Sequence, residues 1–241
     1  MPFASLGVCP QLIAALNHAG LDAPTPVQAQ VVPAVLAGRD VQVQAPTGSG
    51  KTLAFVLPLL QRLIGEGLRG SRTVRQLVLV PTRELAEQVA SVFNQHGRGL
   101  ARAPKVVVAI GGVSINPQML ALRGGADVLV ATPGRLLDLL EHNALLLDGV
   151  HALVLDEADR LLDMGFGEQM QQLLRLLPRT RQSLLFSATY ADDASALALA
   201  SLRDPLQVSV GGEQQAPDIL QRAICVDEPR RNALLQHLAE Q

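Results

Sequence analysis

The stretch Ala45-Pro46-Thr47-Gly48-Ser49-Gly50-Lys51-Thr52 decides the fold that we expect for this chain. Its glycines let the backbone curl so that successive N–H groups point inward at an anion. Lys51 can then reach the β- and γ-phosphates of a nucleotide, and the Thr52 hydroxyl can hold Mg²⁺. The stretch predicts a phosphate-binding loop, although Ala45 replaces the usual first glycine. The alternative is a Gly/Ser-rich turn with a solvated lysine.

The residues on either side of this loop give it the expected context. Residues 41–44 (VQVQ) alternate like a short strand, and residues 53–57 (LAFVL) begin an apolar helix. A helix that starts at the loop directs the positive end of its dipole at the phosphates. The order of strand, loop and helix therefore favours the phosphate-binding interpretation over the simple turn.

The composition bounds the possible classes of protein. Hydrophobic residues make up 48% of the 241 residues and charged residues 17%, which indicates a globular domain with a core. No apolar run approaches the roughly 20 residues of a membrane helix, and the first residues lack the pattern of a secretion signal. Cys9 and Cys225 match no metal or redox spacing, so we expect free thiols and a cytoplasmic protein.

The charge and the aromatic content give no support for nucleic-acid binding. The net charge is −2, and the chain has one Tyr, five Phe and no Trp. Nucleic-acid-binding domains usually show a basic balance, and single strands are often held by stacking on aromatic side chains. Composition alone therefore argues weakly against a nucleic-acid partner.

Short continuous apolar runs alternate with helix-like segments along the chain. The runs are residues 77–80, 106–110, 128–131, 153–155 and 184–186, and the helix-like segments are 84–96, 134–141 and 169–177. Continuous apolar runs suit strands buried on both faces. The alternation predicts an α/β fold with a doubly wound, mostly parallel sheet and helices on both faces. Ligands of such sheets bind outside the carboxyl ends of the strands, where the polar motifs of this chain begin.

The C-terminal part of the chain has a different character. Residues 211–217 (GGEQQAP) have the composition of a linker. Beyond them, residues 222–226 could form a strand and residues 230–239 a helix. We therefore expect a main domain over residues 1–210, a linker over 211–221 and the start of a second α/β domain over 222–241.

An apolar strand that ends in carboxylates is the expected partner of a phosphate-binding loop. The run 153–155 leads directly into Asp156-Glu157-Ala158-Asp159. Asp156 can hold Mg²⁺ through water, because Mg²⁺ keeps much of its hydration shell. Glu157 is then placed to orient or deprotonate an attacking water. The alternative is an ordinary acidic helix N-terminus.

These acidic residues and six further motifs resemble the DEAD-box ATP-dependent RNA helicases. Residues 154–166 (VLDEADRLLDMGF) resemble the sequence of that family around this motif. The resemblance spans residues 3–210 and is greatest to the bacterial branches of the family. It implies a RecA-like P-loop NTPase domain that uses ATP and Mg²⁺. The other motifs follow in the family's order: 24–28 (PTPVQ), 45–52 (APTGSGKT), 81–86 (PTRELA), 111–112 (GG), 132–135 (TPGR) and 187–189 (SAT).

The resemblance implies a role for each residue of the nucleotide site. Gln28 would select adenine, since its amide offers a donor and an acceptor side by side; a solvated glutamine on a helix is the alternative. Leu21 stands where the family has an aromatic residue, so we expect weaker packing on the base. Lys51, Asp156 and Glu157 would be catalytic, and Thr52 and Asp156 would hold the metal. The nucleotide-binding residues implied are Phe3, Leu21, Thr25, Gln28, Thr47, Gly48, Ser49, Gly50, Lys51 and Thr52.

The resemblance also implies contacts to the RNA backbone, which position RNA without reading its sequence. The implied residues are Pro81, Thr82, Arg83, Gly111, Gly112, Thr132, Pro133, Gly134 and Arg135. Taken as isolated fragments these are turns and helix caps, and Thr82 in particular could cap the helix that follows it. Three residues would couple the nucleotide to the RNA, namely Asp159, Ser187 and Thr189.

Members of this family carry a second RecA-like domain with arginine fingers in a glycine–arginine motif. We find no such motif in this chain, since Arg230-Arg231 lacks the glycines. We therefore expect a chain that ends early in the second domain and binds ATP without appreciable turnover. The alternatives are a nucleotide-gated RNA or protein adaptor and, less well supported, a P-loop ATPase of another class.

Overall fold

The computed structural model describes residues 2–65, 73–189, 192–211 and 224–239. Contacts divide the chain into two compact units, Met1–Val210 and Gly211–Gln241. Of the linker expected over 211–221, only Gly211 lies within the described residues.

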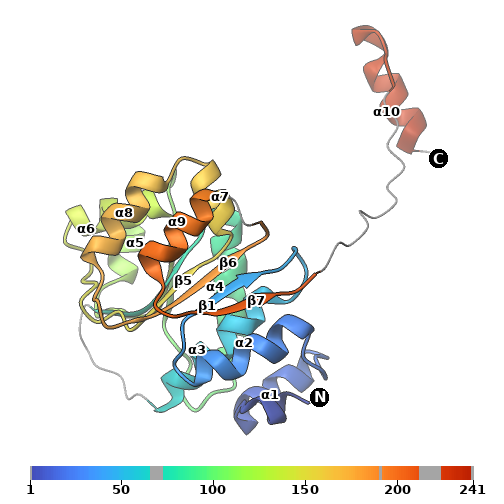
Figure 1. Cartoon of the computed structure of the whole chain (residues 1–241). Helices are drawn as coiled ribbons and strands as arrows, with labels where there is room; N and C mark the ends of the chain where they lie inside the picture. Colours follow the sequence, from blue (N-terminus) through green and yellow to red (C-terminus); the bar gives the residue numbers. More distant parts are fainter. Residues whose placement is uncertain (1, 66–72, 190–191, 212–223, 240–241) are drawn as a thin grey trace. The chain divides into compact units, whose positions relative to one another are not determined.

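One parallel sheet forms the centre of the first unit (Figure 1), with the strand order β3-β4-β2-β5-β6-β1-β7. Each described strand pair is parallel. This architecture confirms the predicted doubly wound α/β fold. The strands are β1 (Val41–Gln44), β2 (Val74–Leu79), β3 (Val106–Ala109), β4 (Ala126–Ala131), β5 (Ala152–Leu155), β6 (Gln182–Ser187) and β7 (Leu206–Ser209).

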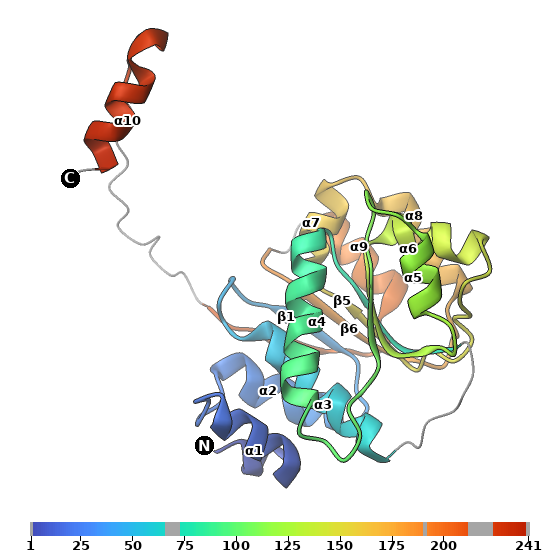
Figure 2. The ribbon, with the colours of Figure 1, turned by 180° about the vertical axis from the view of Figure 1, so that it is seen from behind.

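Helices cover both faces of the sheet. The first face carries the 3-10 helix η1 (Phe3–Leu6) and the helices α1 (Pro10–His18), α2 (Pro26–Leu36), α3 (Lys51–Gly65) and α4 (Arg83–Gly97). Figure 2 shows α4 lying along this face. The second face carries α5 (Asn116–Ala121), α6 (Pro133–Glu141), α7 (Ala158–Asp163), α8 (Gly167–Leu176) and α9 (Asp192–Ser201).

The sheet separates two hydrophobic cores, because successive side chains of a strand point to opposite faces. In β5, Val154 packs into the core under α1 to α4, whereas Leu153 and Leu155 pack into the core under α5 to α9. All three are almost completely buried. Burial on both faces explains why the central strands read as continuous apolar runs.

Two strand assignments differ from the sequence prediction. β7 was not predicted, because it lies at the edge of the sheet and its residues alternate between exposed and buried. In the second unit, residues 224–226 form no strand, so that part of the predicted strand 222–226 is wrong; residues 222 and 223 lie outside the described ones. A strand needs a hydrogen-bonded neighbour, and no described residue pairs with this segment.

The described part of the second unit consists of the 3-10 helix η2 (Glu228–Arg230) and the helix α10 (Arg231–Ala239). The helix expected over residues 230–239 is therefore present. In the residues that the structure describes, no helix is both long enough and apolar enough to cross a membrane.

Candidate nucleotide and RNA site

The predicted phosphate-binding loop joins the carboxyl end of β1 to the first residue of α3. Gly48 and Gly50 have φ angles of 79° and 91°, in the left-handed region that glycine adopts without strain. Lys51 is buried and donates a hydrogen bond from Nζ to the main-chain oxygen of Ala45, 2.6 Å away. Since an ammonium group has three N–H donors, this bond holds the lysine in the loop and leaves donors for a phosphate.

A buried hydroxyl in the same loop fits the anion that the sequence predicts there. Ser49 Oγ is shielded from solvent and has no hydrogen-bond partner in the protein. Buried polar atoms are nearly always paired, so a hydroxyl at the start of α3 without a protein partner suits a hydrogen bond to a phosphate. Thr47 and Gly48 are exposed at the tip of the loop.

The segment expected to bind adenine is built around Thr25 and Gln28, at the start of α2. Thr25 Oγ1 accepts a hydrogen bond from the N–H of Gln28, and Gln28 Oε1 accepts one from the N–H of Thr25, at 3.4 and 2.9 Å. This capping box satisfies N–H groups at the end of the helix. Gln28 is only 3% exposed, which excludes the alternative of a solvated glutamine.

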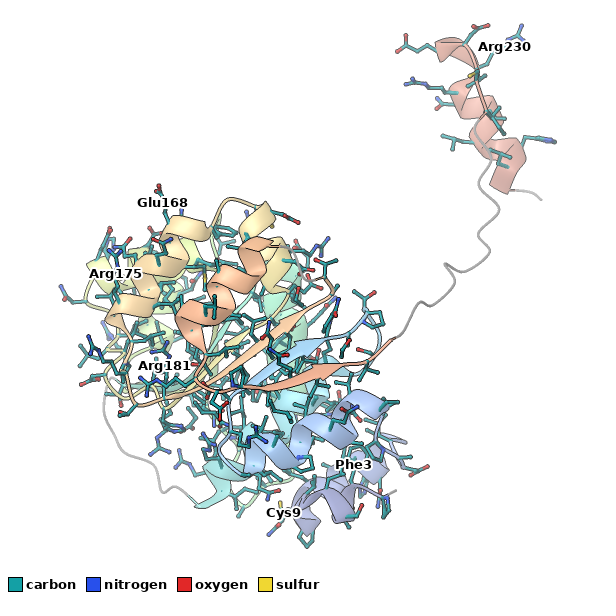
Figure 3. The ribbon with its side chains drawn as sticks, viewed as in Figure 1. Phe3, Cys9, Glu168, Arg175, Arg181 and Arg230 are labelled. Atoms are coloured by element: carbon teal, nitrogen blue, oxygen red, sulfur yellow. The ribbon has the colours of Figure 1, made fainter. Side chains whose placement is uncertain are left out.

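The two other residues assigned to adenine lie in or against the core. Phe3 is 4% exposed and packs among the N-terminal helices (Figure 3). Leu21 is partly buried and packs against the same core. The structure thus places Phe3 as a core residue, whereas Leu21 keeps part of its surface accessible.

The acidic residues follow β5 and lie close to the loop. Asp156 is 3% exposed and accepts a hydrogen bond from the N–H of Glu157 at 3.1 Å. Burial raises the pKa of the Asp156 carboxyl to about 6, although the nearby charge of Lys51 opposes this rise. Because β1 and β5 flank β6 in the parallel sheet, the loop after β1 and the acidic residues after β5 lie at the same carboxyl edge.

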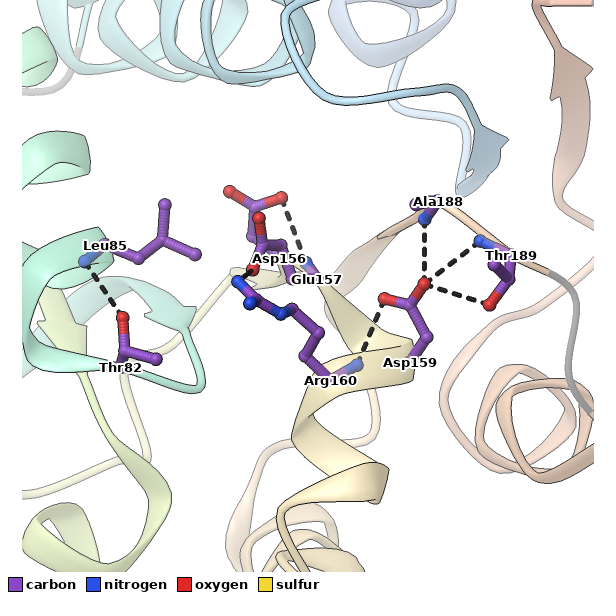
Figure 4. A network of polar contacts seen from close by, with 8 residues as sticks. All are labelled: Thr82, Leu85, Asp156, Glu157, Asp159, Arg160, Ala188 and Thr189. Carbon is purple, nitrogen blue, oxygen red and sulfur yellow. Dashed lines mark hydrogen bonds and ion pairs between the residues drawn. The ribbon is translucent and has the colours of Figure 1, made fainter. Parts of the chain in front are cut away.

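Glu157 sits at the turn between β5 and α7 and carries an unusual backbone. Its φ and ψ of 51° and 54° lie in the left-handed region, which is uncommon for residues other than glycine. Its carboxylate forms an ion pair with Arg160 at 2.9 Å (Figure 4). The two residues are three apart on one helix end, a spacing at which side chains meet.

Asp159 joins this turn to the end of β6. Its Oδ2 accepts hydrogen bonds from the N–H groups of Ala188 and Thr189 and from Thr189 Oγ1, at 3.0 to 3.1 Å (Figure 4). Burial alone would raise the pKa of Asp159, but these bonds and those from Ser187 and the Arg160 N–H hold it below its ordinary value. Asp159, Ser187 and Thr189, predicted as a coupling group, therefore form one network.

The residues expected to hold Mg²⁺ suit that ion. Thr52 and Asp156 supply a hydroxyl and a carboxylate, the hard oxygen donors that Mg²⁺ prefers, and Mg²⁺ typically takes one or two carboxylates together with substrate phosphates. No group of three or more His, Cys, Asp or Glu in the described residues could hold a metal by itself. The donor set therefore fits a metal that binds together with a nucleotide.

A groove of about 730 Å³ lies beside this site at the carboxyl ends of β2, β3 and β4. Eight of the nine residues assigned to RNA line it: Pro81, Thr82, Arg83, Gly111, Gly112, Thr132, Gly134 and Arg135. The ninth, Pro133, is buried at the first turn of α6. The remaining lining residues are Glu84, Asp138, Met164 and Phe166.

Within the groove, several of these side chains also hold the protein together. Thr82 Oγ1 accepts a hydrogen bond from the N–H of Leu85 at 3.2 Å and caps α4 (Figure 4), as its alternative interpretation required. Arg135 is buried, donates from Nη2 to the main-chain oxygen of Val113 at 2.8 Å and lies 3.5 Å from Asp138. Arg83 is exposed, which leaves it as the accessible cation of this set.

Sequence reasoning missed two residues that shape the site. Arg160 pairs with Glu157, and its spacing of three residues from that carboxylate on a helix could have indicated the pair. Gln118 donates to and accepts from the main chain of Ile110, directly before the glycine pair. No local pattern signals Gln118, because its partner lies eight residues away across a loop.

The site combines a glycine loop, a buried lysine and the acidic residues after β5, all at one edge of a parallel sheet. This combination defines a nucleotide-binding α/β protein of the P-loop class. The sequence model of the DEAD/DEAH box helicases matches residues 25–197. The chain belongs to the DEAD/DEAH box helicase family.

Several curated proteins are similar to nearly the whole chain. The ATP-dependent rRNA helicase rrp3 of Emericella nidulans is 44% identical over 98% of the chain and 50% of its own length. The ATP-dependent RNA helicase DbpA of Escherichia coli is 42% identical over 98% of the chain and 51% of its own length. The chain thus spans about half the length of these relatives. Both a fungal and a bacterial protein are among them, so the bacterial branch stays a prediction.

Proposed function

We propose that this chain is the ATP-binding domain of an ATP-dependent RNA helicase, and that it binds ATP with Mg²⁺ and the backbone of RNA. The observation that carries the proposal is that the loop with the buried Lys51, the buried Asp156 and the groove lie at the carboxyl edge of one parallel sheet. The relatives are named RNA helicases, which does not favour the adaptor alternative. A cytoplasmic location is part of the proposal, and both cysteines are free thiols.

In this proposal the nucleotide lies along the carboxyl edge of the sheet. The amide of Gln28 pairs with adenine beside Leu21, the N–H groups of residues 47–52 and the Lys51 ammonium hold the phosphates, and Thr52 and Asp156 hold the metal. Mg²⁺ in this position would offset the charge on the phosphate oxygens. The left-handed glycines let the main chain approach the phosphates closely, since no Cβ intervenes.

Glu157 is the group that orients or deprotonates the attacking water in this scheme. Its ion pair with Arg160 holds the carboxylate at the turn between β5 and α7. Charge on the transferring phosphoryl group would be stabilised by arginines of a second RecA-like domain, which is the proposed intramolecular partner. Local duplex unwinding is accordingly proposed for the whole protein, and nucleotide binding without appreciable turnover for these 241 residues.

Calorimetric titration with ADP and Mg²⁺ tests the proposal on three proteins. The natural chain and Glu157→Gln should bind, because the glutamate acts on water rather than on the nucleotide. Lys51→Ala should bind about 100-fold more weakly or not at all, since it loses the charge beneath the phosphates. Normal binding by Lys51→Ala would refute the loop assignment. Robust RNA-stimulated turnover by the natural chain would refute the statement about turnover.

A further inference from the structure

Gln118, on the short helix α5, makes with its side chain the hydrogen bonds that the main chain of a neighbouring strand would make. Its Oε1 accepts from the N–H of Ile110 at 3.2 Å, and its Nε2 donates to the main-chain oxygen of Ile110 at 3.0 Å. A longer bond of 3.5 Å reaches the main-chain oxygen of Ser114. The side chain is 8% exposed. A single amide therefore satisfies both main-chain groups of the first residue after β3.

Ile110 begins the loop that carries the glycine pair of the groove. At the other end of this loop, Arg135 Nη2 donates to the main-chain oxygen of Val113 at 2.8 Å. The loop is thus fixed at Ile110 and at Val113, and Gly111 and Gly112 lie between these two points. A Cβ on Gly111 would meet nothing within 4 Å, so this part of the loop faces open space. The groove wall is a short peptide segment that is fixed at both ends; Gly111 faces open space, whereas Gly112 lies against the guanidinium group of Arg83.

We propose that Gln118 is a positioning residue for the phosphodiester backbone of RNA, which acts by fixing the direction of the Gly111–Gly112 peptide groups in the groove. The inference rests on the proposed function, which assigns this groove to RNA. Main-chain groups can bind a phosphate or a ribose hydroxyl only if they keep one orientation. Gln118 supplies this constraint from outside the groove, because it is not among the lining residues.

The variant Gln118→Glu offers a test in which protonation decides the outcome. A carboxylate accepts from the Ile110 N–H, but it repels the Ile110 main-chain oxygen that the amide satisfies. A protonated carboxyl group donates to that oxygen and restores both bonds. Burial and the facing carbonyl oxygen favour the protonated form, so the pKa of the new carboxyl group rises above its usual range. RNA binding by the variant should therefore recover as the pH falls.

Fluorescence anisotropy with a short labelled single-stranded RNA, read from about pH 7.5 to about pH 5, measures this effect. Gln118→Glu should bind about tenfold more weakly than the natural chain at the upper pH and should approach it at the lower pH. The charged lining residues Arg83, Glu84, Arg135 and Asp138 are present in both proteins. The ratio of the two affinities at each pH therefore cancels their titration.

Two control variants separate a positioning role from other causes. Gln118→Leu should bind RNA weakly at every pH, because leucine cannot restore the bonds. Gln171→Glu adds the same charge at an exposed position of α8 and should leave RNA binding unchanged. ADP affinity should stay within about twofold of the natural value in all three.

The inference is overturned if Gln118→Glu binds RNA as the natural chain does at about pH 7.5. It is also overturned if ADP affinity falls in parallel with RNA affinity, which would mean that the whole domain is damaged. Failure of the natural chain itself to bind RNA would instead overturn the proposed function, and the inference would fall with it.

Discussion

Gln28 donates a hydrogen bond from its side-chain amide to the main-chain oxygen of Gly50, 3.1 Å away. The same oxygen accepts the first main-chain hydrogen bond of α3, from the N–H of Ala54. The residue expected to select the base is therefore bonded to the loop expected to hold the phosphates. A substitution at either residue should therefore affect the contacts to both the base and the phosphates of the nucleotide.

Gly50→Ala tests this connection. An added Cβ would lie 2.5 Å from Gln28 Nε2 and 2.9 Å from Thr25 Oγ1, so the capping box would have to move. We expect ADP affinity to fall by about tenfold or more, roughly 1.4 kcal/mol. Gly48→Ala is the matched control: its φ is also in the left-handed region, but its Cβ meets nothing within 4 Å. Equal losses in both variants would show that backbone strain alone is responsible.

Gly112→Ala should weaken RNA binding through Arg83. A Cβ on Gly112 would overlap the guanidinium group of Arg83, and the φ of 72° adds backbone strain. Gly111→Ala has open space around its Cβ and serves as the control. We expect a loss of about tenfold in RNA affinity for Gly112→Ala, with little change for Gly111→Ala. An anisotropy titration in which Gly111→Ala lost as much would contradict this explanation.

Asp159→Asn should make the stability of the chain less dependent on acid pH. The hydrogen bonds to Asp159 hold its pKa below 3.8, so the carboxylate stabilises the fold above that pH and loses this effect as the pH falls through the folded pKa. Asparagine cannot accept all of these bonds. We expect urea unfolding to show a loss of about 1–3 kcal/mol at neutral pH.

The difference in the free energy of unfolding between the natural chain and Asp159→Asn should shrink as the pH falls below about 3.8. The carboxyl group of Asp159 then becomes protonated and, like asparagine, carries no charge. Unfolding curves at a series of pH values measure this difference. A difference that stayed constant across the series would indicate that packing, rather than charge, is what Asp159 contributes.

Leu21→Phe should tighten the binding of adenine nucleotides. Leu21 is partly buried against the core and keeps some accessible surface, so a ring at this position could pack on the base. Aromatic packing is worth about 0.5–1.5 kcal/mol, which corresponds to an affinity gain of roughly two- to tenfold. Titration with ADP measures the gain, and the affinity for pyrophosphate should stay unchanged. An unaltered ADP affinity would remove the proposed role of this position.

The sequence predicted the central part of the fold because each central strand is buried on both faces. Leu153 and Leu155 pack on one side of the sheet and Val154 on the other, so the run has no polar position to obscure it. The edge strand β7 lacks this signal, since Gln207 and Ser209 are exposed. The apolar sequence pattern is therefore weaker in a strand that is not buried on both faces, and the sequence of an edge strand resembles that of a loop.

The site could be predicted where chemistry is local and not where it depends on tertiary contacts. Lys51 and Thr52 are adjacent in a recognisable loop, and Asp156 follows an apolar strand. The bond from Gln28 to Gly50 and the bonds from Gln118 to Ile110 depend instead on how distant segments fold together. The family resemblance assigns Arg135 to RNA, and this role stays a prediction; the structure adds that its guanidinium, in the lining of the groove, also donates to the main chain of the neighbouring loop.

A nucleotide bound at the proposed site would connect the two hydrophobic cores of the first unit. Lys51 starts α3, which packs in one core, and Asp156 precedes α7, which packs in the other. A ligand held by both residues, as proposed, would form a cross-link between the layers on the two faces of the sheet. The occupied protein should therefore resist heat and stretching as a single cooperative body, because neither layer can loosen without releasing the ligand.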